Sequence, residues 1–522
     1  MIVLRALIGL AFFCAIAWIL SSDKKRFPWR VVGFGLGMQL VLAYLILWTR
    51  PGMLAFRRMA DFVTAVIARA QPGAELVFGD LAKGNDSQLG FIFAFAGQGL
   101  VVIVFFSALM GVLYHLGIMQ FLIYCMARVM SKLMGVSGAE SMAVAANVFV
   151  GQTEAPLVVK PFLKGMTRSE LNALMTGGFA TIAGSVLAVY MGIVGREFGA
   201  HLLTASVLSA PAAFLIAKIM LPESEDSETG GEVGFKVERT ANNLVEAAAN
   251  GTSDGLHLWL NVMAMLIAFV ALVNLVDWPL EGLGQLLGLE GGLSLTRIFG
   301  WFFAPVAWLM GVEGWHDSQL FGSLLGTKIA VNEFLGFLQL QSMLPESGNE
   351  VVFEHGRSAR MAAYALCGFA NFGSIGIQIG GISPLAPSRK KDLSQLAVRA
   401  MLGGAFASWM TATVAGLFLA ADPPANLSYP TQSIELTLDQ ELAPVAPSVE
   451  NSVIEFWVEP ALPEGLAIDG ADGTLSGVPS VAHEGTHTIT ATNPGGTSST
   501  EIFVRVIDPN AAPQPSPPDE EQ

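Results

Sequence analysis

Long apolar stretches recur through the first 421 residues of this chain, and charged or polar residues separate them. A helix that crosses a bilayer needs about 20 mainly apolar residues. The pattern therefore predicts a polytopic α-helical membrane protein with about eight transmembrane helices set in a lipid bilayer. The stretches that meet this length are 6–21, 31–49, 91–113, 171–195, 201–221, 257–276, 359–382 and 396–420.

Two further apolar segments are interrupted midway by glycine and ionisable residues. The first interrupted segment, 138–163, contains NVFVGQTEAP, and the second, 314–345, contains GTKIAVNEF. Each precedes a stretch with scattered polar residues, at 171–195 and at 359–382. Paired, interrupted segments in corresponding halves indicate an inverted-repeat transporter with its site near the membrane midplane. We therefore expect two re-entrant hairpins, which enter the membrane from opposite sides.

Basic residues set the expected orientation, because they concentrate in cytoplasmic loops. Lys24-Lys25-Arg26 follow the first stretch and Arg389-Lys390-Lys391 precede the last. With both loops inside, the N-terminus and the C-terminal region lie outside, which is periplasmic for a cytoplasmic (inner) membrane. Residues 50–90 also fall outside despite their basic residues. Apolar residues recur there at helical spacing, which predicts an amphipathic helix on the membrane surface. Together with the first two spans, this helix forms an N-terminal region, 1–90.

After the transport core, 91–421, the pattern changes to short runs of alternating apolar and polar residues. Such runs at 433–440, 453–458, 486–492 and 501–507 predict an antiparallel β-sandwich over 424–509. Within it, LPEGLAIDGADGTLSGVP (462–479) resembles the Ig-like or cadherin-like repeats of bacterial surface proteins. The partner of this domain is left open, and 510–522 predict a disordered acidic tail.

Composition and charge support a division into two physically different parts. The chain is 52% hydrophobic and 14% charged, which is too apolar for a soluble protein of this length. Residues 422–522 hold 16 of the 43 acidic residues but only one of the 28 basic residues, so the remainder is neutral with 27 of each. An acidic C-terminal region argues against nucleic acid as a partner.

The interrupted segments place carboxylates inside apolar sequence, at Glu154 and Glu333. An ionised carboxylate at the bilayer centre costs about 2.5–3.5 kcal/mol on insertion scales. One interpretation is structural, in which each carboxylate pairs with Lys160 or Lys328 or caps a broken helix. Intramembrane carboxylates more often mark a substrate or ion path, and we favour that interpretation.

The polar residues near these carboxylates narrow the ligand. Amides and hydroxyls accompany them, and neither motif contains arginine, so an anionic substrate is poorly served. The set suits a neutral solute rich in N–H and O–H donors, such as a sugar-like molecule with a flat ring against apolar side chains. A neutral solute can be concentrated only with a coupled cation. The residues concerned are Gln152, Thr153, Asn371 and Ser374, with Val186 and Phe369 as the apolar contacts.

Three motifs in order, GQTEAPLVVKPF (151–162), NEF (332–334) and GFANFGSIGIQIGG (368–381), resemble the concentrative nucleoside transporter family over nearly all of 1–421. The resemblance implies a transporter, not an enzyme, that works as a homotrimer. Each protomer would hold one nucleoside between two re-entrant hairpins and two unwound helices, and would move it by an elevator-type motion.

The resemblance also implies roles for single residues. Gln152, Thr153 and Glu154 would read the nucleobase, and Gly151 would allow close approach. Glu333, Asn371 and Ser374 would bind the ribose, with Phe369 and Val186 as apolar contacts. A Na⁺ ion would be held by the side chains of Asn147 and Thr181 and the carbonyls of Val150 and Ile182. The intact GQTEAP motif favours Na⁺, although H⁺ is possible.

Other functions remain open on the residues alone. The chain could be a proton-coupled nucleoside transporter, or a cation-coupled transporter of another neutral hydroxylated solute. An intramembrane enzyme is disfavoured because the sequence has no H-E-x-x-H motif. An adhesion or scaffold protein that acts through the C-terminal domain is the last alternative.

Overall fold

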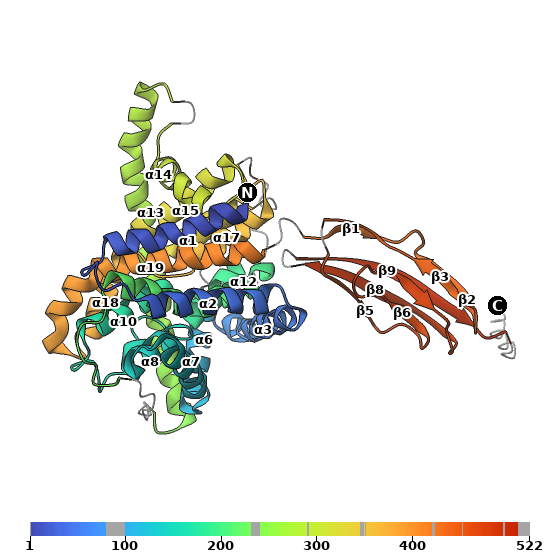
Figure 1. Cartoon of the computed structure of the whole chain (residues 1–522), viewed down its shortest axis with the longest axis horizontal. Coiled ribbons are helices and arrows are strands. Elements are labelled where there is room, and N and C mark those ends of the chain that lie inside the picture. The colour runs from blue at the N-terminus through green and yellow to red at the C-terminus, as the bar shows by residue number, and fades with distance from the viewer. Residues whose placement is uncertain are drawn as a thin grey trace. The chain divides into compact units, whose positions relative to one another are not determined.

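The structure is a computed structural model that describes residues 2–79, 100–230, 241–289, 292–344, 349, 351–419, 423–451, 453–493 and 496–509. The chain divides into a helical unit, Met1–Phe418, and a strand-rich unit, Leu419–Gln522 (Figure 1). The predicted fold class is confirmed at this level, as apolar helices followed by a strand-rich domain. The predicted tail, 510–522, lies outside the described residues.

The helices of the first unit follow the apolar stretches but differ from them in number and continuity. The described helices are α1 (Ile2–Ile19), α2 (Trp29–Leu47), α3 (Arg50–Ala68), α4 (Gln71–Phe78), α6 (Val102–His115), α7 (Ile118–Met134), α8 (Gly138–Asn147), α9 (Ala155–Val158), α10 (Arg168–Ala180), α11 (Gly184–Val194), α12 (Gly199–Met220), α13 (Leu244–Leu286), α14 (Leu295–Leu309), α15 (Trp315–Ala330), α16 (Glu333–Ser342), α17 (Gly356–Leu366), α18 (Phe372–Ile382) and α19 (Lys390–Phe418).

Several helices depart from the predicted spans. Within the described residues, four helices are long and apolar enough to cross a membrane, α1, α2, α12 and the last one, 387–418, and the bent pair α6–α7 passes together at an angle of 75°. The stretches 171–195 and 359–382 are each two helices, because α10 stops at Ala180 and α17 at Leu366. Two helices were not predicted, α7 and α14. The stretch 91–113 is described only from residue 100.

Two helices form the buried centre of the helical unit. In the 18-residue apolar stretch that could cross a membrane in each helix, 89% of the residues are buried in α12 and 83% in the last helix, 387–418, whereas only 28% are buried in α1. The exposed side chains of α1 and α2 are large and apolar, which fits surfaces that face lipid. The helices α10 and α17, which carry the polar-spotted stretches, pack against α19.

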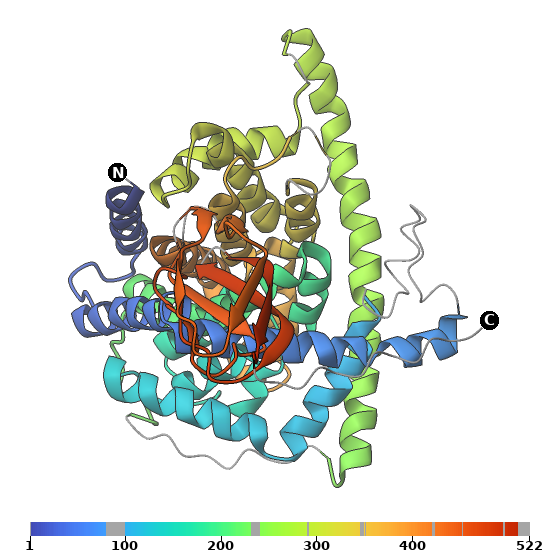
Figure 2. The ribbon, with the colours of Figure 1, turned by 90° about the vertical axis from the view of Figure 1, so that its right-hand side faces the viewer.

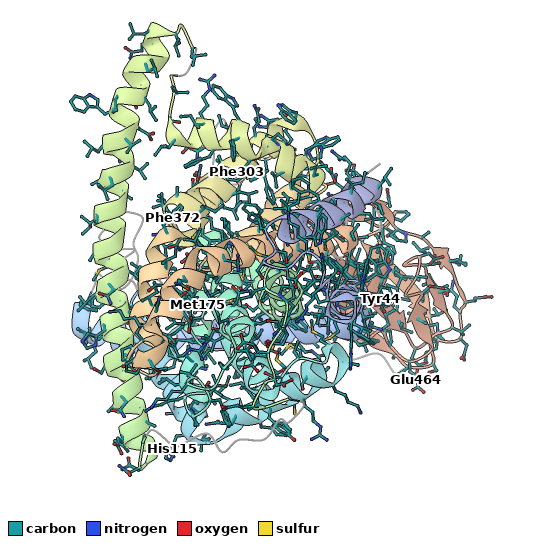
Figure 3. The ribbon with its side chains drawn as sticks, turned by 60° about the vertical axis from the view of Figure 1, so that its left-hand side comes forward. Tyr44, His115, Met175, Phe303, Phe372 and Glu464 are labelled. Carbon is teal, nitrogen blue, oxygen red and sulfur yellow. The ribbon has the colours of Figure 1, made fainter. Side chains whose placement is uncertain are left out.

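The longest described helix is α13 (Figures 2 and 3). It packs against α6 at glycine positions. A Cβ on Gly251 would lie 2.4 Å from the carbonyl oxygen of Ser107, and one on Gly111 would lie 2.6 Å from that of Ala247. Small residues four apart on both helices let the two backbones approach, as in membrane helix pairs. The helix extends well beyond the predicted span, 257–276, at both ends.

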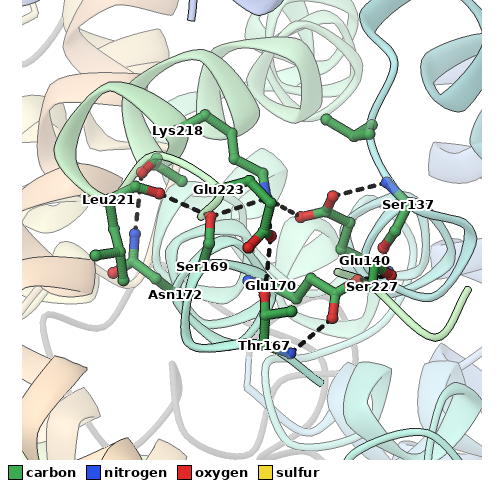
Figure 4. Close-up of polar contacts among 12 residues, drawn as sticks. Ser137, Glu140, Thr167, Ser169, Glu170, Asn172, Lys218, Leu221, Glu223 and Ser227 are labelled. Atoms are coloured by element: carbon green, nitrogen blue, oxygen red, sulfur yellow. Dashed lines mark hydrogen bonds and ion pairs between the residues drawn. The ribbon is translucent and has the colours of Figure 1, made fainter. Parts of the chain in front are cut away.

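A buried ionic cluster anchors the start of the first interrupted segment, near Ser137 and Glu140, which we call its base (Figure 4). Lys218 Nζ, at the end of α12, lies 2.8 Å from Glu140 Oε2 and 3.3 Å from Glu223 Oε2, and it donates to Ser169 Oγ at 3.0 Å. Glu140 also completes a capping box with Ser137, which starts α8. The cluster therefore ties the starts of α8 and α10 to the end of α12.

The strand-rich unit contains two sheets around one apolar core. A four-stranded sheet, β2-β9-β8-β5, and a three-stranded sheet, β3-β7-β6, share that core, with the pair β1-β4 beside them. The strands are β1 (Ala425–Ser428), β2 (Ser433–Thr437), β3 (Leu442–Val445), β4 (Ser448–Glu450), β5 (Glu455–Glu459), β6 (Leu466–Ile468), β7 (Leu475–Gly477), β8 (His483–Asn493) and β9 (Gly496–Ile507).

The expectation of a purely antiparallel sandwich is wrong at one pair. Strand β2 runs parallel to β9, with Ser433 opposite Phe503 and Thr437 opposite Ile507. Parallel neighbours cannot be joined by a tight turn, so the intervening chain first builds the other strands. Alternation of apolar and polar residues shows which side of a strand is buried but not the direction of its neighbour.

Candidate functional site

A cavity of about 1100 Å³ opens in the helical unit and is lined by residues from both interrupted segments and both broken helices. All nine residues expected to contact substrate lie on its wall, although they are spread over more than 220 positions of the sequence. Their binding roles remain predictions. The residues are Gly151, Gln152, Thr153, Glu154, Val186, Glu333, Phe369, Asn371 and Ser374.

The N-termini of two helices lie at the wall of this cavity. Asn332 caps α16, its side chain accepting from Leu335 N at 2.8 Å, and Asn371 caps α18, accepting from Ser374 N at 2.8 Å. Capping by asparagine is why each helix begins where it does. The positive ends of the helix dipoles favour negative charge nearby, which suits Glu333, the first residue of α16.

The Glu333 carboxylate is held by two donors from elsewhere in the chain. Tyr190 Oη donates to Oε1 at 2.8 Å and Asn371 Nδ2 donates to Oε2 at 3.1 Å. The Tyr190 ring is fully buried and stacks on Phe337 of α16, with ring centroids 4.3 Å apart. Two fixed donors leave the remaining lone pairs of a carboxylate able to accept hydrogen bonds from a ligand.

Lys328 does not pair with Glu333. Its ammonium group donates to the carbonyl oxygen of Ala365 at 2.8 Å and to Ser408 Oγ at 2.7 Å, so it joins α15 to α17 and α19. Among the described ion pairs, none joins Glu154 to Lys160 either. The structural interpretation of the two carboxylates as partners of these lysines therefore finds no support in the geometry.

The first interrupted segment presents an amide and a carboxylate on a short turn. Gln152 Oε1 accepts from Gln378 Nε2 at 3.0 Å, and Gln378 also donates to the carbonyl oxygen of Met175 at 3.1 Å (Met175 is labelled in Figure 3). With its oxygen engaged, the Gln152 amide turns its NH₂ group away from Gln378, where it is available to donate.

Glu154 lies on the same turn and is exposed to the cavity. It accepts from Thr153 Oγ1 at 2.9 Å. A Cβ on Gly151 would lie 2.2 Å from Glu154 Oε2, so a side chain at this position would displace the carboxylate from its place against the turn. Gln152, Thr153 and Glu154 therefore present neighbouring acceptors and donors on the cavity wall.

The residues expected to hold Na⁺ lie behind this turn. Thr181 Oγ1 donates to the carbonyl oxygen of Asn147, at 3.1 Å, or to that of Gly177, at 3.0 Å. Asn147 Oδ1 is buried without a hydrogen-bond partner within the described part of the chain. An unsatisfied buried oxygen is costly, and a cation ligated by oxygens would satisfy it. Val150 is on the cavity wall and Ile182, which is buried, follows Thr181.

Tyr190 and Gln378 were not predicted as part of the site. Tyr190 is four residues after Val186 on α11, and Gln378 is four after Ser374 on α18. Side chains four apart share a helix face, so this spacing was the available signal. A single tyrosine or glutamine in an apolar helix is otherwise typical of a buried side chain that forms hydrogen bonds within the protein core.

Models of known protein families match most of the chain. A model described as Na⁺ dependent nucleoside transporter C-terminus matches residues 201–416, and the corresponding N-terminus model matches 8–81. A model described as Nucleoside recognition, named Gate, matches 98–197. A model for an Ig domain matches 418–508, in agreement with the predicted Ig-like resemblance.

Individual relatives give the same result. A Haemophilus influenzae protein named "Uncharacterized transporter" is 45% identical over 80% of this chain and 98% of its own length. Sodium/nucleoside cotransporter 1 of Rattus norvegicus is 39% identical over 78% of this chain and 63% of its own length. The structure of CNTnw in an inward-facing substrate-bound state matches with a TM-score of 0.73 at 39% identity, over 80% of this chain and 98% of that one. Variants of CNTnw in outward-facing and intermediate states match with TM-scores of 0.72 and 0.71.

Proposed function

The chain belongs to the Na⁺-dependent nucleoside transporter family, and we propose that it carries nucleosides into the cell together with Na⁺. The observation that carries this proposal is the convergence of both interrupted segments on one cavity, where Glu333 is fixed by Tyr190 and Asn371. Membership of a transporter family agrees with the expectation that the protein is not an enzyme.

Two sets of residues on the cavity wall suit two parts of a nucleoside. A ribose offers adjacent hydroxyls, and a carboxylate with free lone pairs accepts from both. Glu333 is that acceptor, and Ser374 supplies a hydroxyl beside it. The second set, Gln152, Thr153 and Glu154, offers donors and acceptors to the edge of a base. Val186 and Phe369 supply the apolar surfaces for the ring.

Na⁺ is the coupling ion that the donor set favours. The expected ligands are oxygens only, from the side chains of Asn147 and Thr181 and the carbonyls of Val150 and Ile182. The buried Asn147 Oδ1 fits a cation ligand. About 100 mV contributes about 2.3 kcal/mol per charge, and a tenfold Na⁺ gradient adds about 1.4 kcal/mol. One ion could therefore concentrate a neutral nucleoside several-hundred-fold.

The family match also supports the finer expectations. Inward-facing, intermediate and outward-facing structures of CNTnw resemble this chain, which favours an elevator-type motion. We propose that the protein is a homotrimer in the cytoplasmic membrane, with the N-terminus and the β-domain on the extracytoplasmic side and α3 on the membrane surface.

Uptake of radiolabelled uridine into proteoliposomes tests the coupling. An inward Na⁺ gradient should drive accumulation, and replacing Na⁺ with choline should abolish it. The Thr181→Val variant should lose this Na⁺ stimulation while still binding uridine at high Na⁺ concentration. Equal uptake in choline buffer, or stimulation by a proton gradient instead, would contradict Na⁺ coupling and favour the proton-coupled alternative.

A further inference from the structure

Two histidines of the strand-rich unit bring their ring nitrogens together. His483 and His487 both belong to β8, and their Nε2 atoms lie 2.9 Å apart with ring centroids at 5.0 Å. Side chains four apart on a strand share one side of the sheet but start far from each other. The His483 ring must therefore lie along the strand to reach its neighbour.

Gly485 makes this arrangement possible. It occupies the position between the two histidines on the same side of β8. A Cβ at Gly485 would lie 3.0 Å from His483 Nε2 and 3.4 Å from its Cε1. A side chain at this position would require the His483 ring to shift by a few tenths of an ångström, so glycine favours the close contact of the two imidazoles.

The second imidazole is fixed in orientation and tautomer. His487 is 1% exposed, and its Nδ1 lies 2.9 Å from the carbonyl oxygen of Pro460. A carbonyl only accepts, so Nδ1 carries the proton and Nε2 has a free lone pair. A backbone carbonyl that accepts from the other ring nitrogen is also how proteins orient a metal-binding histidine.

We propose that His483 and His487 form a binding site for a late divalent transition-metal ion, Cu²⁺ in first place. Imidazole nitrogens suit copper, nickel and zinc rather than calcium or magnesium. Two nitrogens bound at a right angle, each about 2.0–2.1 Å from an ion, lie about 2.9 Å apart. The observed separation matches this tetragonal arrangement, which Cu²⁺ and Ni²⁺ prefer.

Binding requires one proton to move within the His483 ring. Without metal, one proton must lie between the two Nε2 atoms, and His483 supplies it because His487 holds its proton at Nδ1. On binding, this proton transfers from Nε2 to Nδ1 of His483, and no proton is lost. His483 is only partly buried, so its ring can tilt until both lone pairs face the ion. The acidic charge of residues 422–522 raises the local concentration of cations.

Titration of the full-length, untagged protein in detergent with Cu²⁺ tests the site. The changes His483→Gln and Gly485→Ala should each weaken binding about tenfold or more, the first by removing a ligand and the second by displacing it. The matched control is His355→Gln, which alters a group of side chains in the described part of the helical unit that could also hold a metal ion, Asp317, Glu354 and His355. It should leave the titration unchanged.

Electron paramagnetic resonance of the Cu²⁺-loaded protein gives a second readout. The wild-type spectrum should show coupling of the copper electron spin to nitrogens of two imidazole rings. In His483→Gln it should show coupling to one imidazole ring. Because His487 is buried, His487→Gln can unfold the domain, so the partly exposed His483 and Gly485 decide the result. Binding that survives both His483→Gln and Gly485→Ala, or that is lost in His355→Gln, would overturn the proposal.

Discussion

The two interrupted segments face one cavity but present different polar groups to it. The first offers several neighbouring polar groups on a short turn, Gln152 to Glu154, of which Glu154 is exposed to the cavity. The second offers one carboxylate, Glu333, which is buried and held from two sides. A set of adaptable groups suits a variable base, and a fixed acceptor suits a ribose that all ribonucleosides share.

The two interrupted segments also differ in the basic residue that anchors the place where each begins. Lys218 closes the first by pairing with Glu140. Arg357 closes the second, where it pairs with Glu313 and donates to the carbonyl oxygens of Gly311 and Gly416. Lys218 gathers its acceptors around one ammonium group, whereas the planar guanidinium of Arg357 presents its donors as a fixed fork. The helical unit thus fixes each segment at its base and varies the chemistry at its tip.

Breaking the base of the first segment should have the largest effect. Lys218→Met would leave Glu140 buried without its cation and should reduce the free energy of unfolding by about 3–5 kcal/mol. Thermal unfolding of the detergent-solubilised protein measures this. The double variant Lys218→Met with Glu140→Gln should recover part of the loss. If the single variant is as stable as the wild type, the cluster does not hold the segment.

Removing the charge at the tip of the second segment should come next. Glu333→Gln keeps the size of the side chain but weakens hydrogen bonds to ribose hydroxyls, so uridine affinity should fall about a hundredfold. Equilibrium binding to the purified protein is the measurement. Wild-type thermal stability would show that the fold is intact, and affinity within a few-fold of the wild type would remove Glu333 from the proposed site.

A smaller loss is expected when only the support of Glu333 is removed. Tyr190→Phe deletes the hydroxyl that donates to Oε1 and should raise the KM for uridine about tenfold, the lower end for a hydrogen bond to a charged group. Tyr364→Phe is a matched control, because Tyr364 is also buried but bonds to His201 away from the cavity. Equal effects of the two changes would mean that Tyr190 acts only through packing.

The smallest effect should separate the two segments most clearly. Gln378→Leu frees the Gln152 oxygen and should alter the preference among bases about three- to fivefold, the size of one neutral hydrogen bond. Competition of uridine uptake by purine and pyrimidine nucleosides measures this preference. A uniform loss for all nucleosides would contradict a role confined to the base.

Sequence reasoning identified residues that line one cavity, because glycine, amide and carboxylate residues together in apolar sequence have few structural explanations. It did not find Tyr190 or Gln378, since one polar residue in an apolar helix does not show which neighbour it meets. Helix α7 was missed because Arg128 and Lys132 interrupt its apolar pattern. The parallel pairing of β2 was missed because strand direction depends on the path of the chain between sheets rather than on local alternation.

The central claim is that Glu333 recognises the ribose hydroxyls, and the most direct measurement compares uridine with 2′,3′-dideoxyuridine as ligands of the unmodified protein. Loss of both hydroxyls removes the two ligand donors and leaves Glu333 with only Tyr190 and Asn371, so we predict that the dideoxynucleoside binds at least about tenfold more weakly. The Glu333→Ala variant should bind the two equally weakly. Equal affinity of the unmodified protein for both nucleosides would contradict the account.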